Sequence, residues 1–257
     1  MTETHPATDP PTALVTGSAA GIGRAAALRL ARAGYQVTIN YSRSSQLAEQ
    51  TLAELHAIGG QHQAVRADVA DEQAVREMVT LAAPAGRLDV LVNNAGTTSP
   101  TAPQALEEID LADWDRVMAT NVRGLVQVTR ACAPALRATG GSVVNVASIV
   151  GLRPGPQPLV YAASKAAVVS LTKTLSAVLA PQVRVNAVAP GWIAGDWMQR
   201  TLGENYERLM DRRANHTPLR RNVTHEDVAE SIYMLAVSHP FVTGEIMVID
   251  GGYSATT

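Results

Sequence analysis

The amino-acid sequence predicts an α/β fold, a doubly wound parallel sheet of about seven strands with helices on both faces. Three observations lead to this prediction. Short apolar runs alternate with longer helical patterns along the chain, which is typical of strand–helix–strand units. Most of the runs are nearly continuous in Val, Ile and Leu, as expected for parallel strands buried on both faces. A glycine-rich turn joins the first run to the first helical pattern, where such sheets bind ligands.

The individual elements follow from these patterns. We expect strands at residues 13–17, 36–40, 62–68, 88–94, 141–148, 183–190 and 245–250. Helical patterns lie between them, at roughly 22–33, 45–58, 71–83, 110–138, 161–180 and 224–237. Asp71 and Thr224 stand where N-caps of the third and last of these helices are expected.

The length of 257 residues suits one large α/β domain or two small ones. No second composition regime, linker or internal repeat divides the chain, which favours one domain over residues 12–257. Residues 1–11 are polar and rich in proline, and we expect a flexible lead there. The segment at about 191–223 interrupts the alternation after a strand, so we expect it to be a substrate lid.

Composition argues against several classes of protein. Hydrophobic residues make up 46% and charged residues 17%, and the net charge is −2 without a long basic run, which argues against nucleic-acid or anionic-membrane partners. No apolar run reaches the ~18 residues of a membrane span, and we expect a cytoplasmic protein. Cys132 is the only cysteine, so no intrachain disulfide can form. The six histidines show no metal-ligand spacing, and we expect no catalytic metal.

The turn reads "ALVTGSAAGIGR" and predicts a dinucleotide site. Glycines there permit a tight turn and close approach of a pyrophosphate, which the free N–H groups of the following helix stabilise. Because the turn follows the first strand and opens the first helix, it has the context that this motif requires. The candidate cofactor contacts are Gly17, Ser18, Gly21, Ile22 and Gly23.

At this point the sequence resembles the short-chain dehydrogenase/reductase family. The turn has the spacing T-G-x-x-x-G-x-G, and "NNAG" at 93–96, Ser148, the Tyr161–Lys165 pair, "RVNAVAPGWI" at 184–193 and "VTGEIMVIDGG" follow in the family's order. The resemblance covers about residues 12–252, and it is nearest to 3-oxoacyl-carrier-protein-reductase-like members. It implies a Rossmann-type sheet and an NAD(P)-dependent oxidoreductase acting on CH–OH groups.

The end of the second strand indicates which dinucleotide binds. An NAD enzyme places Asp or Glu there for the ribose 2′-hydroxyl, but this chain has Asn40. Tyr41, Ser42 and Arg43 follow, and their hydroxyls and guanidinium could bind a 2′-phosphate. We therefore expect NADP(H) to be preferred over NAD(H). A solvated surface charge is the alternative interpretation of Arg43, and many NADP-preferring relatives carry Arg or Lys where this chain has Ala20.

The resemblance implies further cofactor contacts along the chain. Asp68 and Val69 would meet the adenine, and Asn94 would stabilise the sheet beside the cofactor. The remaining contacts are Ala95, Gly96, Pro190, Gly191 and Ile193, with Tyr161 and Lys165.

The Tyr161–Lys165 pair carries the predicted chemistry. Residues i and i+4 share one face of a helix, so the two side chains project together. A free tyrosine has a pKa of about 10, and a nearby ammonium favours the phenolate. We therefore expect the pKa of Tyr161 to be lowered towards about 7, helped by the charge of an oxidised nicotinamide.

The resemblance gives each reacting residue a role. Ser148 stands thirteen residues before Tyr161, the family's usual separation, and would hydrogen-bond the substrate carbonyl. Tyr161 would act as general acid/base, and Lys165 would bind the nicotinamide ribose and tune Tyr161. Asn121 matches the position that holds a water in the proton relay.

The sequence indicates the kind of substrate only through the residues that we expect to surround it. The lid segment carries large apolar and aromatic side chains, which favours an apolar or cyclic carbonyl or alcohol. These are Trp192, Trp197, Met198, Tyr206 and Met210. Gly195 and Asp196 stand where relatives often have a Thr that touches the cofactor, and Arg153 faces either an acidic substrate group or solvent.

Three other hypotheses remain open at this stage. The protein could be a 3-oxoacyl-carrier-protein reductase, although the helix end "KTLSAVLAPQV" lacks the basic residues that an acidic carrier would need. It could be a non-catalytic dinucleotide sensor, although such proteins typically lose the Tyr/Lys pair. Epimerases of this fold need a longer C-terminal domain. We expect a homotetramer or homodimer, built on the small-residue face of 162–176 and on the last strand.

Overall fold

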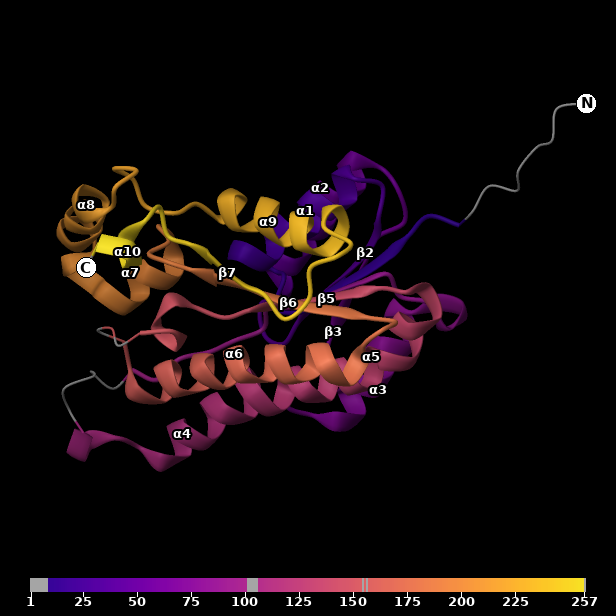
Figure 1. The fold of residues 1–257 in the computed structure, drawn as a ribbon, viewed down its shortest axis with the longest axis horizontal. Coiled ribbons are helices and arrows are strands. Elements are labelled where there is room, and N and C mark those ends of the chain that lie inside the picture. Colours follow the sequence, from indigo (N-terminus) through magenta and orange to yellow (C-terminus); the bar gives the residue numbers. More distant parts are fainter. Residues whose placement is uncertain (1–8, 101–105, 154, 156, 257) are drawn as a thin grey trace, which may run out of the picture.

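The computed structural model describes residues 9–100, 106–153, 155 and 157–256 (Figure 1). Its centre is a sheet of seven parallel strands in the order β3-β2-β1-β4-β5-β6-β7, which confirms the predicted number and direction. The strands are β1 (Thr12–Val15), β2 (Gln36–Tyr41), β3 (Gln63–Arg66), β4 (Val90–Asn93), β5 (Ser142–Val146), β6 (Arg184–Pro190) and β7 (Ile246–Ile249). The order reverses between β1 and β4, which is where open α/β sheets form their ligand crevice.

Helices cover both faces of the sheet (Figure 1). Helices α1, α2 and α9 cover one face, and α3, α5 and α6 the other. The α-helices are α1 (Gly21–Arg32), α2 (Ser45–Ile58), α3 (Glu72–Ala82), α4 (Leu111–Met118), α5 (Leu125–Thr139), α6 (Leu159–Leu179), α7 (Asp196–Leu202), α8 (Tyr206–His216), α9 (His225–Tyr233) and α10 (Tyr253–Thr256). In Figure 1, α7, α8 and α10 gather at the left end of the molecule.

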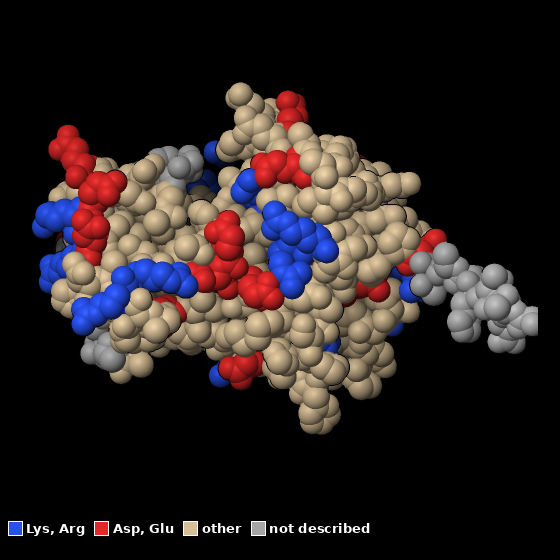
Figure 2. All heavy atoms as spheres, turned by 90° about the horizontal axis from the view of Figure 1, so that it is seen from above, with Lys and Arg blue, Asp and Glu red and all other residues tan. Residues whose placement is uncertain are grey.

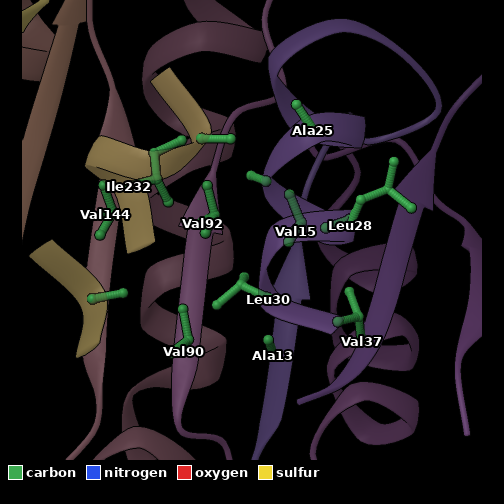
Figure 3. Packing of buried hydrophobic residues seen from close by; sticks show 14 of the residues in the cluster. Ala13, Val15, Ala25, Leu28, Leu30, Val37, Val90, Val92, Val144 and Ile232 are labelled. Carbon is green, nitrogen blue, oxygen red and sulfur yellow. The ribbon is translucent and has the colours of Figure 1, made fainter. Parts of the chain in front are cut away.

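The core follows from the apolar runs of the strands. Figure 3 shows Val15, Val92 and Val144, from β1, β4 and β5, in one cluster with Leu30 of α1 and Ile232 of α9. A parallel strand buried on both faces supplies apolar side chains to both layers, so one short run contributes to two cores. On the opposite face, α3 and α5 pack on Leu14 and Leu91.

The helix predicted at 110–138 is present over residues 111–139, with a π-helical turn inside it that was not predicted. Helix α4 ends at Met118, a π-helical turn occupies Ala119–Gly124, and α5 continues from Leu125. A Cβ on Gly124 would lie 2.8 Å from Val69 Cγ2, so the turn passes close to the loop after β3. A π-turn inserts a residue without breaking the helix, and such turns are frequent at functional sites.

Other differences from the predictions lie at the ends of elements and in the lid segment. Most strands begin or end one or two residues away from the predicted bounds, and 191–223 contains α7 and α8, which we did not predict. Asp71 and Thr224 cap α3 and α9 as expected, Thr224 in a capping box with Asp227. Residues 1–8 of the predicted lead lie outside the described residues, whereas Pro11 O already accepts from Gln36 N at 2.8 Å.

Surface charge is mixed. Figure 2 shows acidic and basic side chains interspersed on the face seen from above, with wide stretches of other residues between them. Within the described ranges, no helix is long and apolar enough to cross a membrane.

A buried polar chain ties the central strands to the helices that flank them. Asn93 on β4 donates to Thr129 on α5 and to Asn145 on β5, each at 2.9 Å. Asn145 in turn donates to Thr172 on α6 at 2.9 Å. Since buried amides are costly unless they are bonded, the chain specifies one alignment of α6 against β5.

Replacing Asn145 with Ala should therefore destabilise the protein by about 1–3 kcal/mol, because Asn93 and Thr172 each lose a buried partner. Urea unfolding measures the loss. Asn215→Ala on the exposed side of α8 is the control, with an expected change within about 0.5 kcal/mol. Equal stability of the two variants would contradict a role for the polar chain.

Candidate active site

The glycine turn after β1 is shaped by its contact with the end of β4. Gly17 has φ +61°, and a Cβ there would lie 2.7 Å from Ala95 Cα. A Cβ on Gly23 would lie 2.5 Å from Asn94 Nδ2, which donates to the carbonyls of Thr16 and Gly17 at 2.9 and 2.8 Å. Side chains are excluded from this cradle, so its backbone stays open to a ligand.

The start of α1 is free to bind an anion. Its N-cap is Ala20, which makes no side-chain cap bond, and the first turn contains no acidic residue. The first N–H groups of a helix need acceptors, and the helix dipole favours a negative one. Gly21 and Ile22 begin the helix, so the turn fits a dinucleotide pyrophosphate.

Two predicted contact residues face inwards. Ser18 is fully buried, and its hydroxyl donates to Val15 O at 2.6 Å and accepts from Asn40 N at 3.0 Å. Asn40 accepts from Gly17 N at 3.1 Å and donates to Val65 O and Ala67 O at 3.3 and 3.0 Å. The side chains of both residues are therefore committed to the fold.

The residues after Asn40 point outwards. Tyr41 is half-buried, whereas Ser42 and Arg43 are exposed. Arg66 at the end of β3 donates from Nε to Ser42 O at 3.2 Å, so a second guanidinium stands beside the predicted phosphate position. We did not predict Arg66, because only the β2–β3 pairing brings it to this place.

The predicted adenine contacts lie after β3. Asp68 is exposed and accepts from Ala70 N at 2.9 Å, which leaves its other carboxylate oxygen towards solvent. Val69 is buried beside Gly124, and its carbonyl accepts from Gln127 Nε2 at 2.8 Å. Val69 lines a small cavity together with Thr16, Ala95 and Gly124.

Ser148, Tyr161 and Lys165 come together as predicted. Ser148 follows β5, and its side chain is hydrogen-bonded to that of Tyr161 on the first turn of α6. Lys165 Nζ lies 5.6 Å from the centre of the Tyr161 ring and donates to Val146 O at 2.7 Å. Lys165 is buried, so its charge acts through protein and not through water.

The pKa of Tyr161 does not follow the expected direction. Burial raises the pKa of Tyr161 to about 12, although the Ser148 bond lowers it. Burial also lowers the pKa of Lys165 to about 8. In both cases removal from water disfavours the charged form. The predicted depression of the Tyr161 pKa therefore requires a further positive charge in the site.

Asn121 lies in the π-helical turn and is almost fully buried. Its Oδ1 accepts from Thr97 N at 2.8 Å, and its Nδ2 donates to Thr97 O and Ser164 Oγ, each at 2.9 Å. A Cβ on Gly96 would lie 3.5 Å from Asn121 Oδ1 and 3.7 Å from Lys165 Nζ. The amide thus stands beside the Lys165 ammonium, with its own donors already used.

The lid segment begins at the end of β6. Pro190 ends the strand. Gly191 lies so close to Asp250 that a Cβ on this glycine would be 2.7 Å from Asp250 Cβ. Ile193 forms an isolated β-bridge with Val223. The ring of Trp197 on α7 lies 6.3 Å from that of Tyr161, so α7 approaches the predicted reacting residue. The expectation for the Asp196 side chain lies outside the described residues.

Two side chains that we did not predict join the parts of the site. Thr16 Oγ1 accepts from the N–H groups of Asn94 and Ala95 at 3.0 and 3.1 Å and so holds the end of β4 to the turn. The His225 ring lies between the turn and the lid, 3.7 Å from a Cβ on Gly21 and 3.1 Å from one on Gly195. Thr16 is the first residue of the T-G-x-x-x-G-x-G motif, but its contact with Asn94 and Ala95, like that of His225, joins residues far apart along the chain and was not predicted.

In the part of the chain that the structure describes, no group of three or more His, Cys, Asp or Glu side chains is placed to hold an ion.

Comparison with known proteins finds similar proteins over nearly the whole chain. A family model described as enoyl-(acyl carrier protein) reductase matches residues 17–254. The chain is 38% identical to the 3-oxoacyl-[acyl-carrier-protein] reductase FabG of Staphylococcus epidermidis over 93% of this chain and 97% of that protein.

Two solved structures are similar over nearly the whole chain. A variant of the actinorhodin polyketide ketoreductase, solved with NADPH, has a TM-score of 0.87 at 31% identity, covering 95% of this chain and 97% of that one. The gluconate 5-dehydrogenase of Burkholderia cenocepacia, in complex with NADP and tartrate, has a TM-score of 0.86 at 30% identity, covering 97% of each chain.

The cradle at Gly17 can be tested against a glycine of similar conformation. Gly34 has φ +88° with no described atom within 4 Å of a Cβ, so Gly34→Ala should cost only the backbone strain of about 1–2 kcal/mol. Gly17→Ala adds an overlap with Ala95, and should lose about 1–3 kcal/mol more and bind NADPH about tenfold or more weakly.

Urea unfolding and titration of NADPH fluorescence measure the two effects. If Gly17→Ala and Gly34→Ala bound NADPH equally well, the turn would not be the dinucleotide cradle.

Proposed function

The chain belongs to the short-chain dehydrogenase/reductase family, whose members are oxidoreductases acting on CH–OH groups, and we propose that it interconverts a ketone and a secondary alcohol using NADP(H). The observation that carries the proposal is the contact of Ser148, Tyr161 and Lys165 at the carboxyl end of β5. These three groups supply a carbonyl donor, a proton donor and a cation within one buried site.

The mechanism divides the work between cofactor and chain. When bound, NADP(H) supplies or accepts the hydride. Ser148 donates a hydrogen bond to the substrate oxygen, and Tyr161 Oη gives that oxygen a proton as the carbonyl becomes an alcohol. The reverse reaction returns the proton to Tyr161. Lys165 holds a positive charge beside the phenol and a donor for the cofactor ribose.

Several contacts support NADP(H) as the preferred cofactor. Asn40 stands where an acidic residue would repel a 2′-phosphate, and its amide is turned into the fold. The exposed Arg43 and the guanidinium of Arg66 flank Ser42. Two cations and a hydroxyl at one strand end suit a phosphate dianion.

The carrier-protein alternative stays within the same chemistry. The similarity to the staphylococcal FabG favours it, since the name of that protein specifies a 3-oxoacyl-carrier substrate. A non-catalytic dinucleotide sensor would have no need for the Ser148–Tyr161 bond or for a buried Lys165. The intact catalytic contact therefore favours an enzyme over a sensor.

We also propose that the protein is a homotetramer or homodimer and that 191–223 is its substrate lid. Val248 on the edge strand β7 is 41% exposed, and Phe241 just before β7 is fully exposed. Apolar groups left open at a sheet edge are typical of subunit interfaces. The lid role rests on the position of Trp197 over Tyr161 and suits an apolar or cyclic substrate.

Tyr161→Phe should lower kcat for ketone reduction by about 10³-fold or more while NADPH affinity changes less than about threefold, because the ring stays and only the proton donor is lost. A panel of ketones read by NADPH absorbance gives kcat, and fluorescence titration gives the affinity. Full activity of the variant would remove Tyr161 from the mechanism.

Arg43→Ala should lower kcat/KM for NADPH about tenfold and leave that for NADH within about twofold, because only NADPH carries the 2′-phosphate. Arg32→Ala, at the far end of α1, is the control for loss of an exposed arginine. A wild-type enzyme more efficient with NADH than with NADPH would show the preference to be wrong.

The lowered pKa of Lys165 predicts a pH effect on cofactor binding. Lys165 is charged below about pH 8 and neutral above it, so affinity for the anionic NADPH should fall as the pH rises. Between about pH 7.5 and 9.5 we expect a loss of roughly tenfold in wild type and a flat profile in Lys165→Met. A slope that persists in the variant would assign the effect to another group.

A further inference from the structure

A pair of stacked side chains within the 191–223 segment takes no part in the proposed mechanism. The guanidinium carbon of Arg213 on α8 lies 4.3 Å from the centre of the Trp192 ring. Trp192 follows β6 by two residues, and β6 pairs with β5, which ends just before Ser148. The pair therefore lies beyond the strand ends that carry the site.

The hydrogen bonds of Arg213 are incomplete. Its Nη1 donates to Tyr253 Oη on α10 at 2.5 Å, but its Nε is buried without an acceptor among the described residues. The Nε1 of Trp192 is likewise buried with no acceptor from the described chain. A buried N–H left unpaired costs about 1–3 kcal/mol, and here two such donors belong to one stacked pair.

The positive charge of Arg213 is a second feature of the pair, beside its incomplete hydrogen bonds. Among the residues that the structure describes, Arg213 forms no ion pair with a carboxylate, although six other arginines do. Arg153, five residues after Ser148, lies 5.9 Å from the Tyr253 ring and donates to Ser254 O at 3.1 Å. Two guanidinium groups thus flank Tyr253 at this edge.

The geometry of Arg213 selects one class of acceptor. Stacking on an indole occupies the flat face of a guanidinium and leaves its in-plane N–H groups for hydrogen bonds. Since Nη1 is used by Tyr253, the remaining Nε–Nη2 edge is the fork that binds the two oxygens of a carboxylate. Trp192 Nε1 is a further donor to the same group.

We propose that Arg213 and Trp192 bind a carboxylate of the substrate, so that the substrate is an oxo acid whose ketone reaches Tyr161. This rests on the proposed function and names its substrate class. The aromatic lid residues contact the apolar part of such a molecule, and the fork fixes its distal end. An ester of the same acid cannot form the charge-assisted fork and lacks this anchor.

The experiment compares oxo acids of about five to ten carbons with their methyl esters, as ratios of kcat/KM at saturating NADPH. In wild type the acid should exceed its ester about tenfold or more. Arg213→Gln should bring the ratio close to one. Arg212→Gln, which removes the same charge from the neighbouring exposed position of α8, should leave the ratio within about twofold of wild type.

Circular dichroism and thermal unfolding show whether Arg213→Gln folds, and a second variant tests the proposal independently of that result. Trp192→Phe keeps the stacking ring and removes only the N–H, and should lower the ratio about threefold to tenfold. Reduction of acids and esters at equal rates in wild type would overturn the inference and leave the proposed function standing. Reduction of neither series would count against the proposed function itself.

Discussion

The buried Lys165 is the interaction on which the candidate site depends. Its ammonium donates to Val146 O on β5, and this bond joins the catalytic helix to the strand that carries Ser148. The loop after Ser148 must approach α6 closely at this point, since a Cβ on Gly151 would lie 2.6 Å from the Lys165 carbonyl carbon. The amide chain through Asn145 and Thr172 repeats the same strand-to-helix link deeper in the core. The position of Tyr161 follows from these contacts.

Burial of this site sets its charge state before any ligand contributes. A rise of the Tyr161 pKa from 10.0 to about 12 corresponds to about 3 kcal/mol in favour of the neutral phenol. A neutral phenol is the proton donor that ketone reduction needs, whereas alcohol oxidation needs the phenolate. Burial alone thus keeps Tyr161 neutral, and a cationic group bound in the site would act in the opposite direction on its pKa.

The sequence was sufficient to predict the sheet, the glycine turn and the Tyr161–Lys165 pair, because each has a local signal. Buried parallel strands read as apolar runs, and an i,i+4 pair needs only a helix. The π-turn at Asn121 had none, since one inserted residue hardly disturbs helical periodicity. Arg66 and His225 reach the site through strand pairing and lid packing, which no short motif records. The pKa of Tyr161 went in the opposite direction because burial, which sequence spacing does not reveal, raises it by more than the Ser148 hydrogen bond lowers it.

The glycine turn and Tyr161 are connected by contacts that pass through the start of the 191–223 segment. Gly195 N donates to Tyr206 on α8 at 3.0 Å, and the His225 ring packs against both Gly195 and Gly21 of the glycine turn. Helix α7 then brings Trp197 over Tyr161. Because α9 begins at His225 in a capping box, the His225 ring that contacts both the glycine turn and the start of the 191–223 segment stands on a capped first turn. Under the proposed function, the cofactor would contact residues at the carboxyl ends of the strands, and the substrate would contact side chains of α7 and α8.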